Sequence, residues 1–289
     1  MYPINRKERA AQIMRQNRFT LKNVEEVEYL TFPLLEQCDV VNHVFSTRLG
    51  GVSDGIYASM NLSFNRGDAP EKVTENFSRI AEIFGRSVEN IVCSDQTHTT
   101  NVRRVYKADG GKGVTRQRDY KDVDALITNE DDVILACFYA DCVPIYFVDP
   151  NKKAIGLAHS GWRGTAGKIS HQVIVAMEKE FGSKREDILA CIGPSICGDC
   201  YEVSEDVANV FMAQEFAGAK AVTTGKREGK FQLDLWKVNL FLLQEAGILP
   251  EHIDVTDVCT CCNGEYLFSH RKSDGKRGNL GAFLMLRKS

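Results

Sequence analysis

The chain has 289 residues, of which 43% are hydrophobic, so it can bury a substantial core in one large domain. Its 36 Lys and Arg residues against 39 Asp and Glu leave a net charge of −3, which excludes a broad positive surface for nucleic acid or an anionic membrane. No segment approaches the roughly 20 apolar residues of a membrane span, and the N-terminus lacks the apolar core of a secretion signal. We therefore expect a cytoplasmic protein that binds small molecules and keeps its ten cysteines reduced.

The first segment is expected to be an extension rather than part of the folded unit. Residues 1–24 carry several basic residues and little acid, among them Arg6, Lys7 and Arg15. This pattern is typical of a solvated, partly helical arm. Residues 25–289 are then expected to form a single catalytic domain.

Next along the chain, short apolar runs alternate with helical patterns. A strand over residues 40–47 precedes a glycine-rich loop that begins at Arg48. Asp68 and Glu71 have the spacing of a capping box, and apolar residues at helical intervals follow it up to Gly85. Further strands are predicted from residue 91 to about His98, and over residues 125–128, 133–140 and 143–148.

The second half of the chain continues the alternation. Strands are predicted over residues 154–158 and 188–192, and a glycine-flanked turn at Gly161 leads into a helix along Ile169, Val173 and Met177. Further helices are predicted over residues 204–211 and 233–246, and strands over 266–270 and 282–286. Because several strands are joined by short connections, the pattern indicates an α/β (α+β) single domain with a central mixed β-sheet flanked by helices.

Three ligand-type residues lie at or near the ends of predicted strands: His98, Cys142 and His159. Strand ends meet at one edge of a sheet, so the three side chains could converge on one cation. Two imidazoles and a thiolate suit zinc, and three protein ligands leave a fourth position for water or substrate. Each residue alone has a plainer interpretation, as a hydrogen-bonded buried histidine or an inert core thiol.

Neighbouring residues add candidate roles. Gln96 is predicted to share a strand face with His98, and Asp141 places a carboxylate beside Cys142 as a proton carrier or a support for the ligand, although it could equally be structural. The turn after His159 exposes backbone N–H groups at a helix start, which favours an anion such as phosphate. Arg163 in that turn and Arg48 in the earlier glycine loop are candidate anion clamps, although a single arginine is more often a surface residue.

Taken together, the motifs resemble those of the laccase-domain family, also called YfiH-like or multicopper polyphenol oxidase-like. The resemblance covers residues 25 to 287 in order, through the strings Ser46-Thr-Arg-Leu-Gly-Gly, Met60-Asn-Leu-Ser, Gln96-Thr-His98, Tyr139-Ala-Asp-Cys-Val-Pro144, His159-Ser-Gly-Trp-Arg-Gly164, Ile192-Gly-Pro194 and Cys200-Tyr-Glu-Val203. It implies a single α/β domain with a central mixed sheet, and zinc bound by His98, Cys142 and His159.

The resemblance also implies an activity. Family members are regarded as zinc-dependent purine nucleoside enzymes, which implies phosphorolysis of adenosine, inosine, guanosine and methylthioadenosine and deamination of adenosine. Zinc can activate a water for deamination, whereas phosphorolysis needs an anion site. Asn61 and Gln96 join Arg48 and Arg163 as candidate substrate or phosphate contacts. The family's C-terminal Gly-Arg pair is replaced here by Arg277-Gly-Asn, so Arg271 or Arg277 could substitute for that arginine.

Four alternatives remain open at this point. Cys197, Cys200, Cys259 and Cys262 have paired CxxC spacing, which predicts either a second, structural zinc site or packed thiols. Copper could replace zinc at the first site, and a copper-dependent phenol oxidase would use the same residues, but six histidines and no His-x-His pair are few for a multicopper enzyme. Cys142 could instead be a nucleophile with His159 as its base. A metal-stabilised scaffold without turnover is the non-enzymatic alternative.

Overall fold

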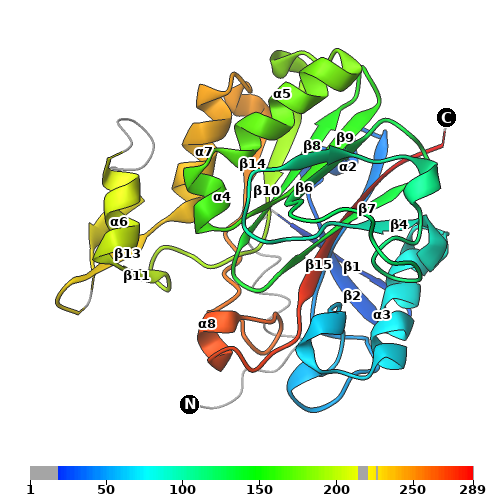
Figure 1. The fold of residues 1–289 in the computed structure, drawn as a ribbon, viewed down its shortest axis with the longest axis horizontal. Coiled ribbons are helices and arrows are strands. Elements are labelled where there is room, and N and C mark those ends of the chain that lie inside the picture. The colour runs from blue at the N-terminus through cyan, green and yellow to red at the C-terminus, as the bar shows by residue number, and fades with distance from the viewer. Residues whose placement is uncertain (1–18, 214–220, 226, 289) are drawn as a thin grey trace.

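Two six-stranded β-sheets pack face to face at the centre of the protein, and helices cover their outer faces (Figure 1). The computed structural model describes residues 19–213, 221–225 and 227–288. The basic residues predicted for the N-terminal arm up to residue 18 lie outside this part. Residues 20–24, the end of the predicted extension, form an edge strand of the first sheet.

The first sheet combines segments from both ends of the chain. Its strands stand in the order β1 (Thr20–Val24), β2 (Val27–Thr31), β3 (Val41–Ser46), β15 (Leu280–Leu286), β7 (Ile134–Tyr139) and β4 (Ile91–Cys93). All neighbours are antiparallel except β4 and β7, which run parallel. The C-terminal strand β15 therefore lies in the middle of the sheet, and the fold needs the two ends of the chain together.

The second sheet carries most of the strands predicted from the middle of the chain. Its order is β14 (Ile253–Val255), β10 (Leu189–Ile192), β8 (Val143–Asp149), β9 (Ala154–Ser160), β6 (Ala125–Thr128) and β5 (Val102–Arg104). Only the outermost pairs, β10 with β14 and β5 with β6, are parallel. A small third sheet, β11 (Glu202–Ser204), β13 (Lys230–Leu233) and β12 (Val222–Thr224), lies with α6 (Glu205–Met212) at the edge of the molecule in Figure 1.

Successive side chains of the central strands point alternately into two different cores. In β7, Leu135 and Tyr139 face the second sheet, whereas Ile134 and Ala136 face α3 (Pro70–Ile83). In β8, Tyr146 joins the core between the sheets, and the alternate residues pack under the helices of the other side. Those helices are α4 (Trp162–Ala166), α5 (Ile169–Phe181) and α7 (Leu235–Glu245), which Figure 1 places on the opposite side of the molecule from α3.

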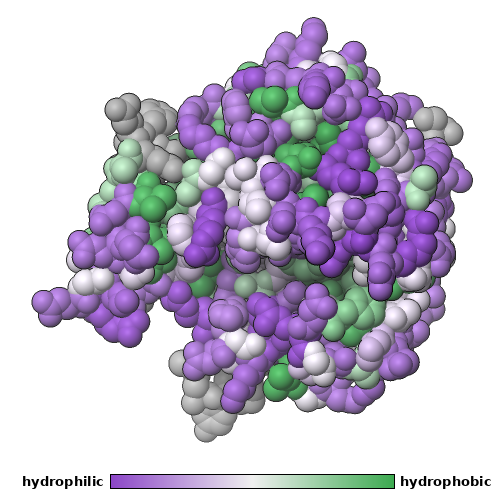
Figure 2. All heavy atoms as spheres, viewed as in Figure 1, coloured by the Kyte–Doolittle hydropathy of each residue, from purple (hydrophilic) through white to green (hydrophobic). Residues whose placement is uncertain are grey.

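Shorter helices complete the connections. Among the described residues, the other α-helices are α2 (Pro33–Gln37) and α8 (His270–Ser273). Single 3₁₀ turns occur at Gly55–Tyr57, Phe64–Arg66, Val88–Asn90, Lys107–Asp109, Arg185–Asp187 and Pro250–His252. No helix in the described part of the chain is long and apolar enough to cross a membrane. On the face drawn in Figure 2, hydrophilic residues predominate and hydrophobic residues form small, separate groups.

The predicted class, an α/β domain with mixed sheet flanked by helices, is confirmed, with the strands divided between two sheets. Three local predictions are wrong. The capping box at Asp68 does not form: Ala69 is the N-cap residue of α3 and Pro70 opens the helix, while Asp68 accepts a hydrogen bond from Asn61. The strand over residues 266–270 is a turn followed by α8, because the N–H groups of Tyr266 and Leu267 donate to the carbonyl oxygen of Asn263 and the Ser269 side chain caps α8. The strand predicted from residue 91 to about His98 ends at Cys93.

Candidate functional site

His98, Cys142 and His159 come together from three different segments of the chain. His98 lies in the loop between β4 and β5, Cys142 in the turn between β7 and β8, and His159 in β9. Their ligand atoms all lie within 4.8 Å of one another, and Cys142 Sγ is 3.9 Å from His98 Nε2. Two ligands on one tetrahedral zinc would be about 3.5 Å apart, given bonds of about 2.1 Å to nitrogen and 2.3 Å to sulfur. The spacing suits a single metal ion.

The backbone takes an uncommon conformation at one of these residues and directly before another. His98 has a φ of 66° and Asp141, next to Cys142, has a φ of 90°. Such values are uncommon outside glycine, but Asp and His are among the residues that adopt them more often, usually in tight turns. At Asp141 the chain reverses between β7 and β8, which delivers Cys142 to the sheet edge. At His98 the expected strand alternation does not apply, so the predicted shared face with Gln96 is wrong.

A buried carboxylate, Asp124, ties two of the three segments together. It accepts backbone N–H groups from Thr97, His98 and Thr99 at 2.8–3.1 Å and lies 2.7 Å from His159 Nδ1. Burial by itself would raise the pKa of Asp124, but His159 and the hydrogen bonds from Thr99 outweigh it and lower the pKa. Asp124 is therefore a carboxylate that accepts a hydrogen bond from Nδ1 of His159, which leaves Nε2 of His159 as the ligand atom that faces His98 and Cys142.

The charges within the group favour the metal-binding form of Cys142, whereas His159 has to lose a proton when it binds a metal. Burial alone raises the pKa of the Cys142 thiol, but the imidazoles of His159 and His98 outweigh burial and lower it to about 6. For His159 burial lowers the pKa, whereas Cys142 and Asp124 raise it to about 9. Cys142 is thus a thiolate near neutral pH, which is the form that binds metal.

The packing around the group leaves room for an ion. A Cβ added to Gly161 would lie 2.8 Å from the His98 ring and 3.1 Å from Cys142 Sγ, so only glycine fits beside both ligands. His98 is exposed and His159 is buried, so the group is open on one side. Three donors of the N, N, S type with an open fourth direction fit a catalytic zinc ion. Copper accepts the same donors, so the geometry alone does not choose the metal.

A cavity of about 320 Å³ opens over this group. Arg277 lines it and is only 7% exposed. Its Nε has no hydrogen-bond partner in the described part of the chain. Burial and the neighbouring guanidinium of Arg66 lower the pKa of Arg277 to about 10. Two adjacent arginines, one of them buried, create a positive region that suits an anion.

Of the other residues predicted to contact substrate or phosphate, two lie at or next to the cavity and two lie away from it. Gln96 lines the cavity, where its amide is fixed to the backbone of Phe138 by 2.7 Å hydrogen bonds. Asn61 is buried behind the cavity and accepts a hydrogen bond from the backbone of Asn279, which lines it. Arg48 and Arg163 do not line the cavity. Arg48 donates to the carbonyl oxygens of Ala58 and Gly264, which fixes the glycine loop, and exposed Arg163 stacks on Trp162.

Asp141 also lies outside the cavity lining. Its carboxylate accepts a hydrogen bond from Thr260 Oγ1 at 2.6 Å and another from the backbone N–H of Arg271 at 2.7 Å. It therefore connects the turn that carries Cys142 to two C-terminal segments. Of the two arginines considered as substitutes, Arg277 enters the cavity, and Arg271 donates to the carbonyl oxygens of Cys200 and Glu202 instead.

Sequence reasoning missed Asp124 and Arg66 as parts of the site. The signal for Asp124 was a carboxylate directly before a buried apolar run, which has to be paired when it is buried. Arg66 follows the Met60-Asn-Leu-Ser motif but has no distinctive context of its own. Its role depends on Arg277, which lies more than 200 positions later, and no pattern within one sequence connects the two.

Fold and site together define an α/β protein with a His₂Cys group at the floor of an arginine-lined cavity. The chain belongs to the family described as Multi-copper polyphenol oxidoreductase laccase, whose model matches residues 42–287. This confirms the family resemblance found in the motifs.

Relatives of known name and structure agree with this assignment. The chain is 35% identical over 249 residues to Purine nucleoside phosphorylase YlmD of Bacillus subtilis (strain 168), covering 85% of this chain and 88% of that protein. It is also 35% identical over 260 residues to Purine nucleoside phosphorylase of Bacteroides thetaiotaomicron, covering 90% and 96%. The crystal structure of Bacillus licheniformis hypothetical protein YfiH superposes with a TM-score of 0.87 at 33% identity, covering 94% of this chain and 100% of that one.

Proposed function

We propose that this protein is a zinc-dependent purine nucleoside phosphorylase. Its substrates would be adenosine, inosine, guanosine and S-methyl-5′-thioadenosine together with phosphate, and it would also deaminate adenosine. The relatives named purine nucleoside phosphorylase support the first activity. The family resemblance alone supports the list of nucleosides and the deamination.

The observation that carries the proposal is that one cavity is lined both by the metal-ligand group and by a pair of arginines. His98, Cys142 and His159 line the same cavity as Arg66 and Arg277. Phosphorolysis needs both elements, because phosphate has to be held close to the ribose while the purine leaves with the electrons of the broken C–N bond.

The chain's own residues divide the work as follows. Arg277 and Arg66 bind phosphate, since two guanidinium groups match the oxygens of an anion in a fork geometry. Gln96 presents a rigid amide to the substrate, because both ends of that amide are held by Phe138. Asp124 keeps the Nδ1 proton of His159, which fixes the imidazole orientation. Zinc held by the three ligands would supply Lewis-acid chemistry and an activated water for deamination.

Product analysis tests this proposal. Zinc-loaded protein is incubated with inosine or adenosine, with and without phosphate, and the products are separated by chromatography. We expect hypoxanthine and ribose 1-phosphate from inosine only when phosphate is present, and inosine with ammonia from adenosine without it. Free ribose in place of ribose 1-phosphate would contradict phosphorolysis, and adenosine left intact in the absence of phosphate would remove the deaminase activity.

One geometric feature favours a second candidate function. Cys142, His159 and Asp124 form a chain of thiolate, imidazole and carboxylate, and the pKa of Cys142 is lowered to about 6. This arrangement is that of a cysteine hydrolase with an oriented base. Activity that survives chelation but disappears after alkylation of Cys142 would favour the hydrolase. Loss on chelation that zinc restores would favour the phosphorylase.

The identity of the metal is part of the proposal. Copper binds such a donor set more tightly than zinc does in the Irving–Williams order, so phenol oxidation by copper-loaded protein is the natural competitor. We expect nucleoside turnover to increase with zinc content and phenol oxidation to stay at background. Oxidation of a phenol in proportion to bound copper would contradict this choice of metal.

A further inference from the structure

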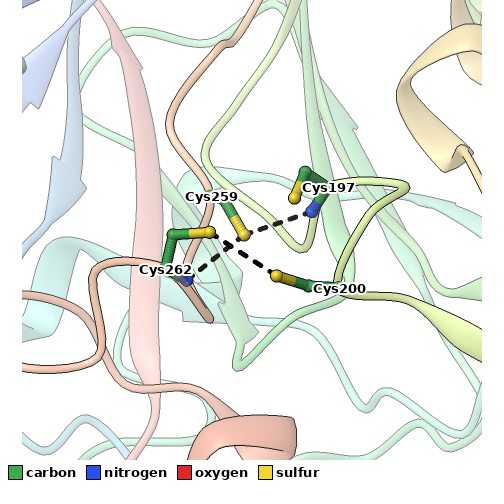
Figure 3. Close-up of side chains that lie close together, drawn as sticks. All are labelled: Cys197, Cys200, Cys259 and Cys262. Atoms are coloured by element: carbon green, nitrogen blue, oxygen red, sulfur yellow. Dashed lines mark hydrogen bonds between the residues drawn. The ribbon is translucent and has the colours of Figure 1, made fainter.

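Four cysteines outside the cavity come together from two loops that are far apart in the sequence. Cys197 and Cys200 follow β10, and Cys259 and Cys262 follow β14 (Figure 3). The strands β10 and β14 are parallel neighbours, and Ser195 bridges to Cys259 just beyond them. The parallel pairing therefore brings both CxxC segments to the same edge of the second sheet. Their four sulfur atoms all lie within 4.8 Å of one another.

The spacing of the sulfur atoms matches one tetrahedral ion. Four thiolates on a single zinc, with bonds of about 2.3 Å, are separated by about 3.8 Å. Cys200 Sγ and Cys262 Sγ are 3.5 Å apart, which is too far for a disulfide bond of about 2.05 Å. An iron–sulfur cluster places two or more irons between its thiolates, so it needs wider spacing than this group has.

Backbone amides are also directed at one of the sulfurs. The N–H groups of Cys197 and Cys262 donate to Cys259 Sγ at 3.3 and 3.4 Å, as the dashed lines in Figure 3 show. A neutral thiol is a weak acceptor, whereas a thiolate is stabilised by such donors. Four sulfurs held this close would repel one another as thiolates unless a cation lay between them. The contacts are those expected around a bound metal ion.

We propose that Cys197, Cys200, Cys259 and Cys262 bind a second zinc ion with a structural role. Four protein thiolates complete the tetrahedral coordination and leave no position for water or substrate, so this ion takes no part in turnover. Its binding energy contributes to folding, because the unfolded chain has no preformed site.

The position of this site connects it to the cavity. Thr260 lies between two of the cysteines and donates to Asp141, the residue before Cys142. The backbone N–H of Ile196, before Cys197, donates to the carbonyl oxygen of Asp141 at 3.0 Å. Both loops clamped by the second zinc therefore hold the turn that presents Cys142. Loss of the ion would loosen that turn without removing any group from the cavity.

Zinc counting on purified protein tests the proposal without using turnover. After removal of loosely bound metal, we expect two zinc ions per chain for wild type and one for His98→Ala, which keeps all four cysteines. Cys197→Ser and Cys200→Ser should each lose one ion. Cys261→Ser is the matched control, because Cys261 lies in the same segment but outside the four-sulfur group, and it should keep two.

A measurement without cysteine substitutions covers the case in which those variants do not fold. Cobalt is loaded into His98→Ala, where the absorption spectrum should report a tetrahedral ion with four thiolate ligands. One zinc in wild type and none in His98→Ala would overturn the proposal. A metal-free wild type whose mass is two hydrogens lower, restored by a reductant, would also overturn it, in favour of a disulfide. Because no step uses nucleoside turnover, this result is independent of the proposed activity.

Discussion

Asp124 is the residue on which the geometry of the first metal-ligand group depends. It holds the His98 loop through three backbone N–H groups and orients His159 through Nδ1. An Asn side chain keeps the size but offers one acceptor oxygen and turns an NH₂ group towards these donors. We expect Asp124→Asn to weaken zinc binding by about 10- to 100-fold, as for other carboxylates that orient a ligand histidine. Competition with a coloured chelator measures this.

Asp122→Asn is the matched control for that experiment. Asp122 is exposed and lies two residues away. Its carboxylate accepts a hydrogen bond from the side-chain hydroxyl of Thr97 and does not contact a histidine. We expect this variant to bind zinc as wild type does. Equal zinc affinity in both variants and wild type would mean that Asp124 does not support the site.

Substitutions of Arg277 and Arg163 distinguish two candidate anion sites, the cavity and the helix start that was predicted from the sequence. Charge-assisted hydrogen bonds contribute about 1.5–3 kcal/mol, which corresponds to about 10- to 100-fold in binding. We expect Arg277→Gln to raise the KM for phosphate by that factor, because Arg277 lines the cavity. Arg163→Gln should leave it within about twofold, since Arg163 is exposed and stacks on Trp162. Steady-state rates at varied phosphate concentration give the KM of each variant. A raised KM in Arg163→Gln with an unchanged KM in Arg277→Gln would contradict the assignment.

At this scale the sequence predicts residue types better than positions in space. His98, Cys142 and His159 were found because few other histidines and cysteines follow strand ends in motifs of this kind. Arg48 was expected to hold an anion, yet its guanidinium is used by two loop carbonyls. An arginine in a glycine-rich loop serves either purpose, and only the folded chain shows which carbonyl groups lie within its reach.

At the scale of elements, the contact between α2 and β3 carries a pH dependence. His43 of β3 is buried, and its Nε2 accepts the backbone N–H of Phe32 at 2.7 Å. Burial lowers the pKa of His43 to about 3, from 6.5 in the unfolded chain. The unfolded state then binds the proton more readily, so stability falls as the pH drops below 6.5 and continues to fall until about 3. Between pH 7 and pH 5 the loss is about 2 kcal/mol.

Urea unfolding at pH 7 and pH 5 measures this contribution. In His43→Gln the side-chain oxygen can accept the same N–H but does not titrate. The difference in unfolding free energy between wild type and this variant should therefore change by about 2 kcal/mol over the interval, which cancels the contributions of all other groups. Parallel pH profiles for the two proteins would show that His43 is not the cause.

The turn from β9 into α4 allows a test of the space beside the ligands. Gly161→Ala places a methyl group 2.8 Å from the His98 ring, so the ring has to move. We expect nucleoside turnover to fall on the order of tenfold, since small misplacements at a site are costly. Gly164→Ala in α4 meets nothing closer than 3.4 Å and should keep wild-type activity. Equal activities of the two variants would contradict the tight packing at His98.

Most elements of regular structure could be predicted from the sequence, and the errors have two causes. Strands such as β6 and β15 are continuous apolar runs between polar turns, and α3 repeats apolar residues at helical spacing. The edge strands β1, β5 and β14 were missed because they are short and only partly buried. Residues 266–270 resembled a strand because Tyr266, Leu267 and Phe268 form an apolar run, but a buried turn can be equally apolar.

At the scale of the whole molecule, the two sheets bring the site together from distant parts of the chain. β7 lies in the first sheet and β8 in the second, so the turn that carries Cys142 crosses between them. His159 comes from the second sheet, and Arg277 leads into β15 of the first. The sequence predicted mixed strand pairing from short connections but not the division into two sheets, because strand partners distant in sequence leave no local pattern.

The most direct test of the account is the rate of hypoxanthine release from inosine, with zinc-loaded wild type beside His98→Ala, each with and without phosphate. We predict release by wild type that requires phosphate, and release by His98→Ala that is at least 100-fold slower because one of three ligands is missing. Rapid phosphate-dependent release by His98→Ala would contradict the role of the metal-ligand group. No release by fully zinc-loaded wild type would contradict inosine phosphorolysis.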